Sequence, residues 1–118
     1  MSTICSSKYA YKLMTAEQWH MARRLDLWSG SQVDLADGFV HLSAADQVKG
    51  TLDKWFAGQG ELFLVAFDVA SLEQHCDVRW EASRGGALFP HVYGLLPMDL
   101  VDQVHRLLPD DYVLPPLA

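Results

Sequence analysis

Residues 61–69 (ELFLVAFDV) form an almost continuous apolar run, and this run constrains the fold more than any other segment. A short run with so little polar alternation is typical of a strand that is buried on both faces. Both faces of such a strand need cover, so we expect a sheet at the centre of a layered domain. The 118 residues have room for one domain, which we place over 1–118 with residues 1–7 frayed.

The segments around the run predict an α+β fold, in which a mixed sheet of five or six strands carries two packed helices. Thr15 and Gln18 fit a capping box, which predicts a helix that begins after Thr15. A second helix is expected over 44–56, with Ser43 as its N-cap. Residues 102–108 suit a helix or a strand, and their Val and Leu content favours the strand. The other expected strands are 9–14, 39–43, 78–81 and 88–96, and single helical turns are expected at 71–75 and 97–101.

Charge and cysteine content narrow the class of protein. Nine basic and fifteen acidic residues give a net charge of −6, whereas binding to duplex nucleic acid needs a surplus of Lys and Arg. No apolar run reaches the ~18 residues of a membrane span, and residues 1–10 lack the apolar segment of a signal peptide. Cys5 and Cys76 are too few for a disulfide framework. We therefore expect a cytoplasmic protein with free thiols that binds neither membranes nor duplex nucleic acid.

Three of the predicted strands alternate in the same way. Side chains two positions apart on a strand point to the same face. One face of each strand is plainly apolar, and the other carries groups that can form hydrogen bonds or transfer protons. These groups are Phe39, His41 and Ser43 on the first strand, Arg79 and Glu81 on the second, and Phe89, His91 and Tyr93 on the third. If the three faces meet, they form the wall of a pocket.

We expect His41, Glu81 and His91 to be the catalytic residues of this pocket. An imidazole transfers protons near neutral pH, and a carboxylate can hold a ribose hydroxyl or stabilise positive charge on a sugar carbon. Simpler interpretations stay open. The strands can form an ordinary half-buried sheet surface, and Glu81 can form an ion pair with Arg79 or Arg84.

Further residues are expected to bind the ligand of this pocket, namely Ser43, Arg84, Phe89 and Tyr93. The segment Arg84-Gly85-Gly86 could hold an anion through its guanidinium and backbone N–H groups, although Gly-Gly is more often a flexible turn. Ser43 beside His41 could also be a nucleophile, but its position before the expected helix explains it better as an N-cap.

We expect neither a metal ion nor a tightly bound cofactor. The sequence has no His-x-x-x-His or Cys-x-x-Cys spacing, no P-loop and no Gly-x-Gly-x-x-Gly fingerprint. A metal site made of His41, His91 and Glu81 is the less favoured alternative. His20, His75 and His105 are expected to be solvated or satisfied within the fold.

Three motifs follow the opening Tyr11-Lys-Leu13. They are Asp37-Gly-Phe-Val-His-Leu-Ser43, Arg79-Trp-Glu81 and Phe89-Pro-His-Val-Tyr-Gly94. In this order they resemble the bacterial domain-of-unknown-function family 952, over roughly residues 9–108. The resemblance implies an ADP-ribosyltransferase-like fold, a split mixed sheet around an NAD-binding cleft, and kinship with the RNA 2′-phosphotransferases. It also implies that His41, Ser43, Glu81, His91 and Tyr93 lie in the cleft.

The function implied by the resemblance is an NAD-utilising enzyme of the ADP-ribosyl-transfer type, either a transferase or a glycohydrolase. Its partner would be a small-molecule nucleotide such as NAD or ADP-ribose, with Arg84 at the pyrophosphate. The chain departs from the superfamily's usual order, because Glu81 precedes Tyr93. Two alternatives stay open. One is a non-catalytic module that binds a nucleotide or sugar, and the other is a protein-interaction domain whose sheet face is covered by a partner.

Overall fold

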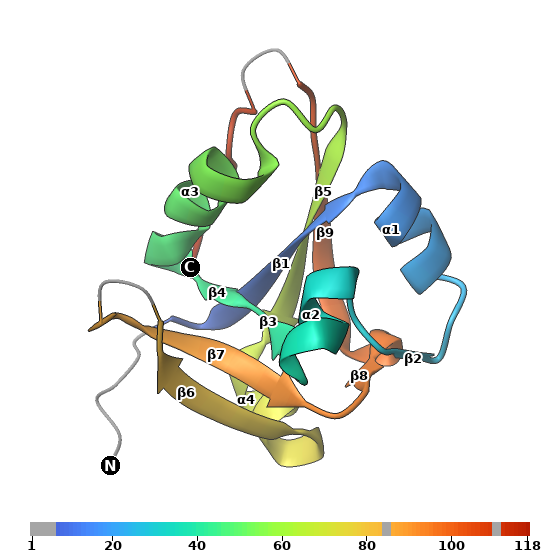
Figure 1. Cartoon of the computed structure of the whole chain (residues 1–118), viewed down its shortest axis with the longest axis vertical. Coiled ribbons are helices and arrows are strands. Elements are labelled where there is room, and N and C mark those ends of the chain that lie inside the picture. The colour runs from blue at the N-terminus through green and yellow to red at the C-terminus, as the bar shows by residue number, and fades with distance from the viewer. Residues whose placement is uncertain (1–6, 84–85, 110–111) are drawn as a thin grey trace.

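The computed structural model of the chain describes residues 7–83, 86–109 and 112–118 (Figure 1). Its largest sheet has the strand order β4-β1-β5-β9, and neighbouring strands are antiparallel. β5 lies inside this sheet, between β1 and β9, as the apolar run predicts. The segment 102–108 was ambiguous in sequence, and its residues 102–107 form most of β9, so the preference for a strand is confirmed. The strands are β1 (Tyr9–Thr15), β4 (Ser43–Ala44), β5 (Leu62–Asp68) and β9 (Val101–Leu107).

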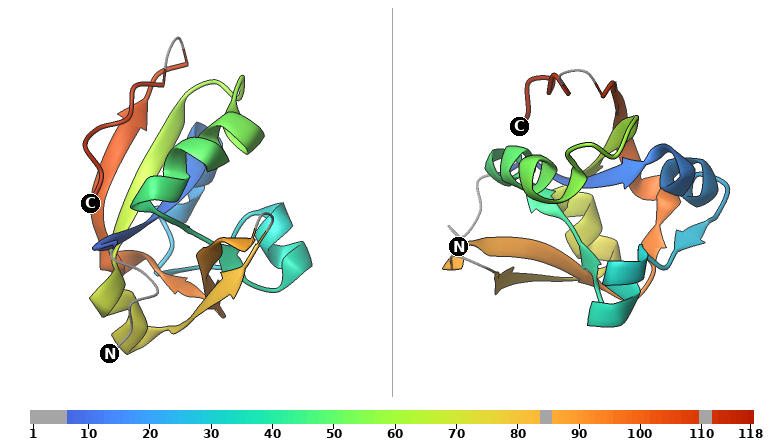
Figure 2. Two further views of the ribbon diagram at one scale, coloured as in Figure 1. Left: turned by 90° about the vertical axis from the view of Figure 1, so that its left-hand side faces the viewer. Right: turned by 45° about the horizontal axis from the view of Figure 1, so that its top comes forward.

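The two faces of this sheet contact two separate clusters of core residues. Leu64 and Ala66 of β5 belong to one cluster, whereas Val65 and Phe67 belong to the other, so the burial of β5 on both faces is confirmed. A helical segment and the C-terminal residues 112–118 cover the first face. The segment consists of η1 (Ala45–Gln47), α3 (Val48–Thr51) and η2 (Leu52–Phe56), and it matches the helix predicted over 44–56. α1 (Ala16–Ala22), α4 (Val69–His75) and the remaining strands lie against the second face (Figure 2).

Two smaller sheets complete the described fold. β7 (Leu88–Tyr93) pairs with β3 (Val40–His41) on one side and with β6 (Asp77–Ala82) on the other. β2 (Leu27–Trp28) pairs with β8 (Leu96–Pro97). Every pairing among the described strands is antiparallel, so the expectation of one mixed sheet is wrong. Short connections such as the one between β6 and β7 join antiparallel neighbours, whereas parallel neighbours need a long crossover.

The segment 39–43, predicted as one strand, is divided between two sheets. Val40 and His41 pair with β7, whereas Ser43 and Ala44 pair with β1. Leu42 lies between the two pairs and is only 2 % exposed, so it enters the core as the chain crosses. This crossing joins the sheet of β3 directly to the central sheet and fixes the position of His41.

The described residues contain four α-helices and not the expected two. The capping box of Thr15 and Gln18 begins α1, as predicted. Ser43 is not the N-cap of the next helical segment. Ala44 takes that place, and its backbone N–H donates to the side-chain oxygen of Gln47 at 2.9 Å. α2 (Gln32–Asp37) was not predicted, because six residues are too few to show a helical period.

Short helical elements lie where single turns were expected. η4 (Met98–Leu100) occupies the predicted turn at 97–101, and α4 includes the predicted turn at 71–75. Among all described residues, no helix has the length and apolar character needed to cross a bilayer. The expectation that residues 1–7 are frayed falls mostly outside the described residues, of which Ser7 is the first.

Candidate functional site

The candidate site lies on the β3-β7-β6 sheet, on the face opposite the buried side chains of Val40 and Val92. Strand pairing sets His91 of β7 directly between His41 of β3 and Arg79 of β6. Directly opposite residues on neighbouring strands point to the same face, so these three side chains form a row across the sheet. We call the group that gathers here the histidine cluster, which consists of Phe39, His41, Arg79, Glu81, His91 and Tyr93.

Glu81 contacts two members of the histidine cluster through one oxygen. Its Oε1 accepts a hydrogen bond from the Tyr93 hydroxyl at 2.8 Å and lies 2.8 Å from Nδ1 of His91. The hydrogen bond from His91, followed by that from Tyr93, lowers the pKa of the Glu81 carboxyl. The hydrogen bond between Tyr93 and Glu81 in turn raises the pKa of the Tyr93 hydroxyl. Glu81 is therefore a carboxylate at neutral pH and favours a proton on Nδ1 of His91.

The side chains of His91 and Glu81 differ in their exposure to solvent. The side chain of His91 is 7 % exposed, whereas that of Glu81 is 37 % exposed. Among the described residues, His91 Nε2 and Glu81 Oε2 have no hydrogen-bond partner, and no fully buried side-chain nitrogen or oxygen is left unpaired. Within the described part of the chain, both atoms therefore remain available to form a hydrogen bond with a ligand.

Phe39 holds the rings of the histidine cluster in place. Its ring centroid lies 4.2 Å from that of His91 in a stacked arrangement, 4.5 Å from that of His41 and 5.1 Å from that of Tyr93. The two imidazoles meet edge to face at 5.2 Å. Contacts of this kind fix the ring planes, so the nitrogen atoms keep defined directions.

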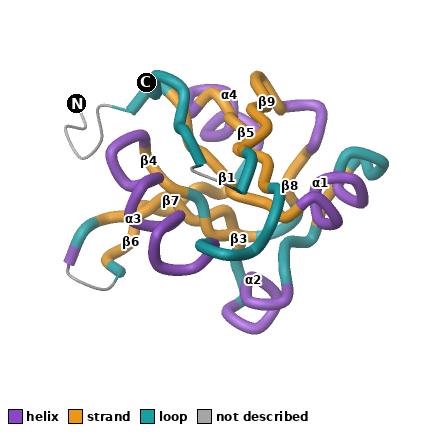
Figure 3. Tube along the Cα trace, turned by 90° about the horizontal axis from the view of Figure 1, so that it is seen from above, coloured by secondary structure: helices purple, strands orange, loops and turns teal. Residues whose placement is uncertain are grey.

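α2 supplies a carboxylate to each nitrogen of His41. Nδ1 lies 2.7 Å from Oδ1 of Asp34, and Nε2 lies 3.0 Å from Oδ2 of Asp37. Only an imidazolium has an N–H group on both nitrogens and can donate to both carboxylates. The capping box of Ser31 and Asp34 begins α2, and the helix lies beside β3 (Figure 3).

Lys12 lies beneath the histidine cluster and pairs with Asp34. Its Nζ is 2.9 Å from Oδ2 of Asp34 and donates to the backbone oxygen of His41 at 2.9 Å. The side chains of Lys12 and Asp34 are 9 % and 2 % exposed. Burial lowers the pKa of Lys12, although attraction to Asp34 opposes it.

The pKa of Asp34 reflects its dense set of donors. Burial alone would raise this pKa, but the hydrogen bond from His41, the charge of Lys12 and the backbone N–H of Ser31 outweigh it. The net pKa of Asp34 lies well below the ordinary range. Asp34 is therefore a fixed negative charge that orients His41 from the buried side.

The structure brings together His41, Glu81, His91 and Tyr93 of the predicted site residues. The Ser43 side chain forms its hydrogen bond elsewhere, since its Oγ lies 3.0 Å from the hydroxyl oxygen of Thr51. Phe89 of β7 pairs with Glu81 of β6, and its side chain is half-buried. Its ring contacts no ring of the histidine cluster among the described residues. Arg84 lies outside the described residues, so its expected contact with an anion stays a prediction.

Lys12, Asp34 and Asp37 surround His41 but were not among the predicted site residues. Lys12 is a lysine within an otherwise apolar strand, and that position was a signal of a buried charge. Ser31 followed three residues later by Asp34 was a signal for a helix N-terminus. Nothing in the sequence indicated that Asp37 reaches Nε2 of His41, because that contact depends on how α2 packs beside β3.

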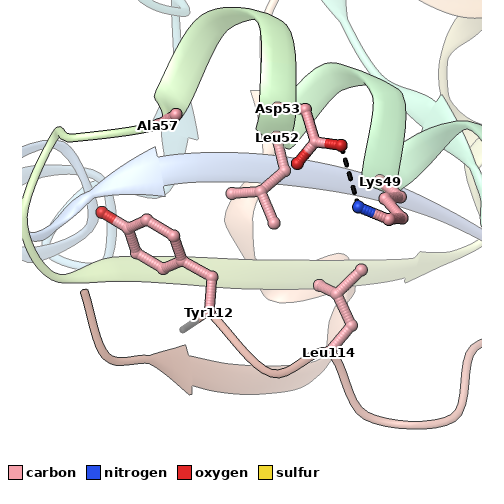
Figure 4. A pocket seen from close by; sticks show the side chains of 6 residues that line it. All are labelled: Lys49, Leu52, Asp53, Ala57, Tyr112 and Leu114. Carbon is pink, nitrogen blue, oxygen red and sulfur yellow. Dashed lines mark hydrogen bonds and ion pairs between the residues drawn. The ribbon is translucent and has the colours of Figure 1, made fainter. Parts of the chain in front are cut away.

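The hollow that the structure shows lies away from the histidine cluster. Among residues 7–83, 86–109 and 112–118, no group of three His, Cys, Asp or Glu side chains is arranged to hold a metal ion. A hollow of ≈ 340 Å³ lies between the helical segment 45–56 and the C-terminal residues (Figure 4). Its lining includes Leu52, Tyr112 and the exposed ion pair of Lys49 with Asp53. Of the predicted site residues that the structure describes, none lines this hollow.

Solved structures of one relative resemble the chain closely. The crystal structure of protein CC0527 from Caulobacter crescentus is 43 % identical in sequence, with a TM-score of 0.81 over 88 % of this chain and 90 % of that chain. The solution NMR structure of CC0527 is also 43 % identical, with a TM-score of 0.76 over 88 % of each chain. No curated protein matches the chain. The sequence profile described as "Protein of unknown function (DUF952)" matches residues 13–104.

Proposed function

Since the chain belongs to the DUF952 family, whose description names no activity, we propose a function from the geometry of the histidine cluster. The protein is an enzyme that cleaves the bond between nicotinamide and ribose in NAD, a reaction of the ADP-ribosyl-transfer type. In the simplest case, water accepts the ADP-ribosyl group, and the reaction is then a hydrolysis of NAD.

One observation carries this proposal: Glu81 Oε1 lies 2.8 Å from His91 Nδ1, while His91 Nε2 has no hydrogen-bond partner among the described residues. A carboxylate that accepts from Nδ1–H leaves the lone pair of the neutral imidazole on Nε2. A nitrogen lone pair that is held in a fixed direction at the edge of a site suits a general base. The lowered pKa of Glu81 keeps its carboxylate charged for this task.

The proposed reaction balances with these groups. A water oxygen attacks the ribose carbon that bears nicotinamide, and its proton passes to Nε2 of His91. The bond between that carbon and the nicotinamide nitrogen breaks, and nicotinamide leaves as a neutral molecule with the electron pair. Oε2 of Glu81, free among the described residues, hydrogen-bonds a ribose hydroxyl and stabilises the positive charge on the sugar.

The charge of the site also supports NAD as the substrate. The rings of Phe39 and Tyr93 offer flat surfaces, and the carboxylates of Asp37 and Glu81 lie within the same contact network. Aromatic faces attract cations, and nearby carboxylates add to that attraction. The oxidised nicotinamide ring is both flat and positively charged.

The contacts of His41 with two carboxylates support a second candidate function. Both of its nitrogens already contact carboxylates, so we assign it to positioning and not to proton transfer. A site in which no imidazole transfers a proton would be a non-catalytic module that binds a nucleotide or sugar. Turnover separates this alternative from the enzyme.

The test is to measure nicotinamide release from NAD together with calorimetric titration of NAD, ADP-ribose and nicotinamide. Glu81→Gln and His91→Gln should each lower turnover about 100-fold or more while NAD still binds. His75→Gln is the matched control, because His75 is an exposed histidine at the end of α4. Binding without nicotinamide release would support the module and refute the enzyme, and absence of binding would refute both.

The proposal also includes a relation to the ADP-ribosyltransferase-like fold and a location in the cytoplasm. A central sheet joined through residues 40–44 to a second sheet supports an ADP-ribosyltransferase-like arrangement, although all described pairings are antiparallel. The free thiol of Cys76 suits the reducing cytoplasm, where we place the protein.

A further inference from the structure

Arg79 lies across the ring of Tyr93 in the free protein. Its guanidinium carbon is 4.0 Å from the ring centroid, a close cation–π contact. The hydroxyl of the same ring donates to Oε1 of Glu81 at 2.8 Å. A flat cation of the chain itself therefore occupies the aromatic surface next to the carboxylate that we assign to the reaction.

Asp77 holds Arg79 in this position from the same strand. The two side chains form two contacts, Nη2 to Oδ2 at 2.9 Å and Nε to Oδ1 at 3.3 Å. They are 53 % and 54 % exposed, so water surrounds the pair. Exposed ion pairs and exposed cation–π contacts are both weak, so little free energy is needed to remove the guanidinium from the ring.

The buried pair of Lys12 and Asp34 shows the contrast within the same site. It is almost completely buried, and removal of one partner would leave the other as a buried charge without a partner. Arg79 has room to turn toward solvent, because its side chain is already half exposed and β6 is an edge strand of its sheet. The ring of Tyr93 would keep its position, since it also contacts Phe39 and Glu81.

We propose that the ring face of Tyr93 and the carboxylate of Asp77 form a binding site for a planar cationic ring, and that Arg79 fills this site until such a ligand displaces it. The inference rests on the proposed function and names its ligand class, an N-substituted pyridinium such as the oxidised nicotinamide ring. The ligand would take over both contacts of Arg79, the aromatic face and the carboxylate. A neutral ring of the same shape gains only the stacking contact, so the site should favour the oxidised form of a nicotinamide nucleotide over the reduced form.

The test uses two small probes that differ in charge, N1-methylnicotinamide as the cation and nicotinamide as its neutral counterpart. Binding is measured by calorimetry and by the NMR shifts of the Tyr93 ring. We expect Arg79→Gln to bind N1-methylnicotinamide about fivefold more tightly than the wild type, because the competing guanidinium is gone. Binding of nicotinamide should change by less than about twofold.

Three further variants make the test specific. Tyr93→Leu should lose the binding of N1-methylnicotinamide, whereas Tyr93→Phe should keep it, because the ring remains and only the hydroxyl is removed. Arg23→Gln is the matched control, since Arg23 lies 5.9 Å from the ring of Trp19 on α1, away from the histidine cluster. Its affinity for the cation should equal that of the wild type.

The inference fails if Arg79→Gln binds the cation no more tightly than the wild type, or if Arg23→Gln gives the same gain. Its failure can be told from failure of the proposed function. If the wild type releases nicotinamide from NAD but Arg79→Gln does not bind N1-methylnicotinamide more tightly, only the proposed cation site is refuted. A gain in Arg79→Gln without any NAD cleavage would support the cation site and refute the enzyme.

Discussion

The ammonium group of Lys12 lies 2.9 Å from the carboxylate of Asp34, and this buried pair connects the central strand β1 to the short helix α2. The remaining donors and acceptors of the pair are used. Lys12 also donates to the backbone oxygen of His41, and Asp34 accepts from the backbone N–H groups of Ser31 and His41. Because Asp34 also contacts the His41 ring, the position of the candidate site depends on a charge pair inside the core.

Replacement of Lys12 with methionine should destabilise the fold strongly. Lys12→Met removes the positive charge and leaves the carboxylate of Asp34 buried, which costs about 3 kcal/mol in the free energy of unfolding. Urea denaturation of the two proteins gives this difference directly. Lys49→Met is the control, because Lys49 forms an exposed ion pair with Asp53 and should cost less than about 1 kcal/mol. Equal losses in the two variants would contradict the importance of the buried pair.

The stability of the protein should fall in acid because of Asp34. Its pKa lies well below the ordinary value in the folded chain and near the ordinary value of about 4 in the unfolded chain. As the pH falls below about 5, the unfolded chain takes up the proton first, so the free energy of unfolding falls by up to about 1.4 kcal/mol per pH unit from this group. The stability that Asp34 contributes is thus fully present above pH 5.

Asp34→Asn tests this assignment by measurement of unfolding between pH 2 and pH 7. The variant should be less stable than the wild type at neutral pH, and the difference should shrink as the pH falls. Asp53→Asn changes a carboxylate in an exposed ion pair and should keep the acid dependence of the wild type. A constant difference between Asp34→Asn and the wild type across this range would exclude Asp34 as the source.

Gly30 should tolerate substitution less well than Gly38, although both have a positive φ. A Cβ atom at Gly30 would lie 2.6 Å from the Cβ atom of Asp34, whereas a Cβ at Gly38 would meet nothing within 4 Å. Gly38→Ala should cost about 1 kcal/mol from backbone strain alone. Gly30→Ala should cost about 2 kcal/mol or more, because Asp34 must also move. Thermal unfolding of both variants measures the difference, and equal costs would mean that Asp34 adapts freely.

The long elements of the fold were predictable from sequence, whereas the two-residue strands β2 and β8 were not. β5 and α1 each have a local signal, an apolar run for β5 and a capping box for α1. β2 and β8 have two residues each, so neither can show an alternation of side chains. Their pairing depends on how distant segments of the chain meet, which no local pattern records.

The candidate site was predictable in part for the same reason. Alternation along β7 places His91 and Tyr93 on one face, and alternation along β6 does the same for Arg79 and Glu81. The pairing of the two strands then brings these faces to the same side of the sheet. Lys12 and Asp34 reach His41 from other elements, so their contribution depends on packing between β1, α2 and β3. Ser43 was placed wrongly in the alternation because the chain leaves one sheet for another at residue 42.

Ser43→Ala should lower stability and leave ligand binding unchanged. Ser43 is 6 % exposed and its hydroxyl lies 3.0 Å from that of Thr51, so the loss of this hydrogen bond should cost about 1 kcal/mol. NAD affinity should stay within about twofold of the wild type, because the Ser43 hydroxyl pairs with Thr51 and not with a polar group of the histidine cluster. A clear loss of affinity at unchanged stability would instead support the prediction that Ser43 binds the ligand.

The neutral imidazole of His91 should carry its proton on Nδ1. Glu81 accepts at that nitrogen from 2.8 Å, so the opposite tautomer would place a lone pair against a carboxylate. Long-range ¹⁵N–¹H spectra of ¹⁵N-histidine-labelled protein distinguish the two tautomers. Glu81→Gln, which removes the charge, should give a mixture of both, while the signals of the exposed His75 stay the same. A wild-type His91 protonated on Nε2 would contradict its assignment as the general base, because the lone pair would then face Glu81 and not the substrate.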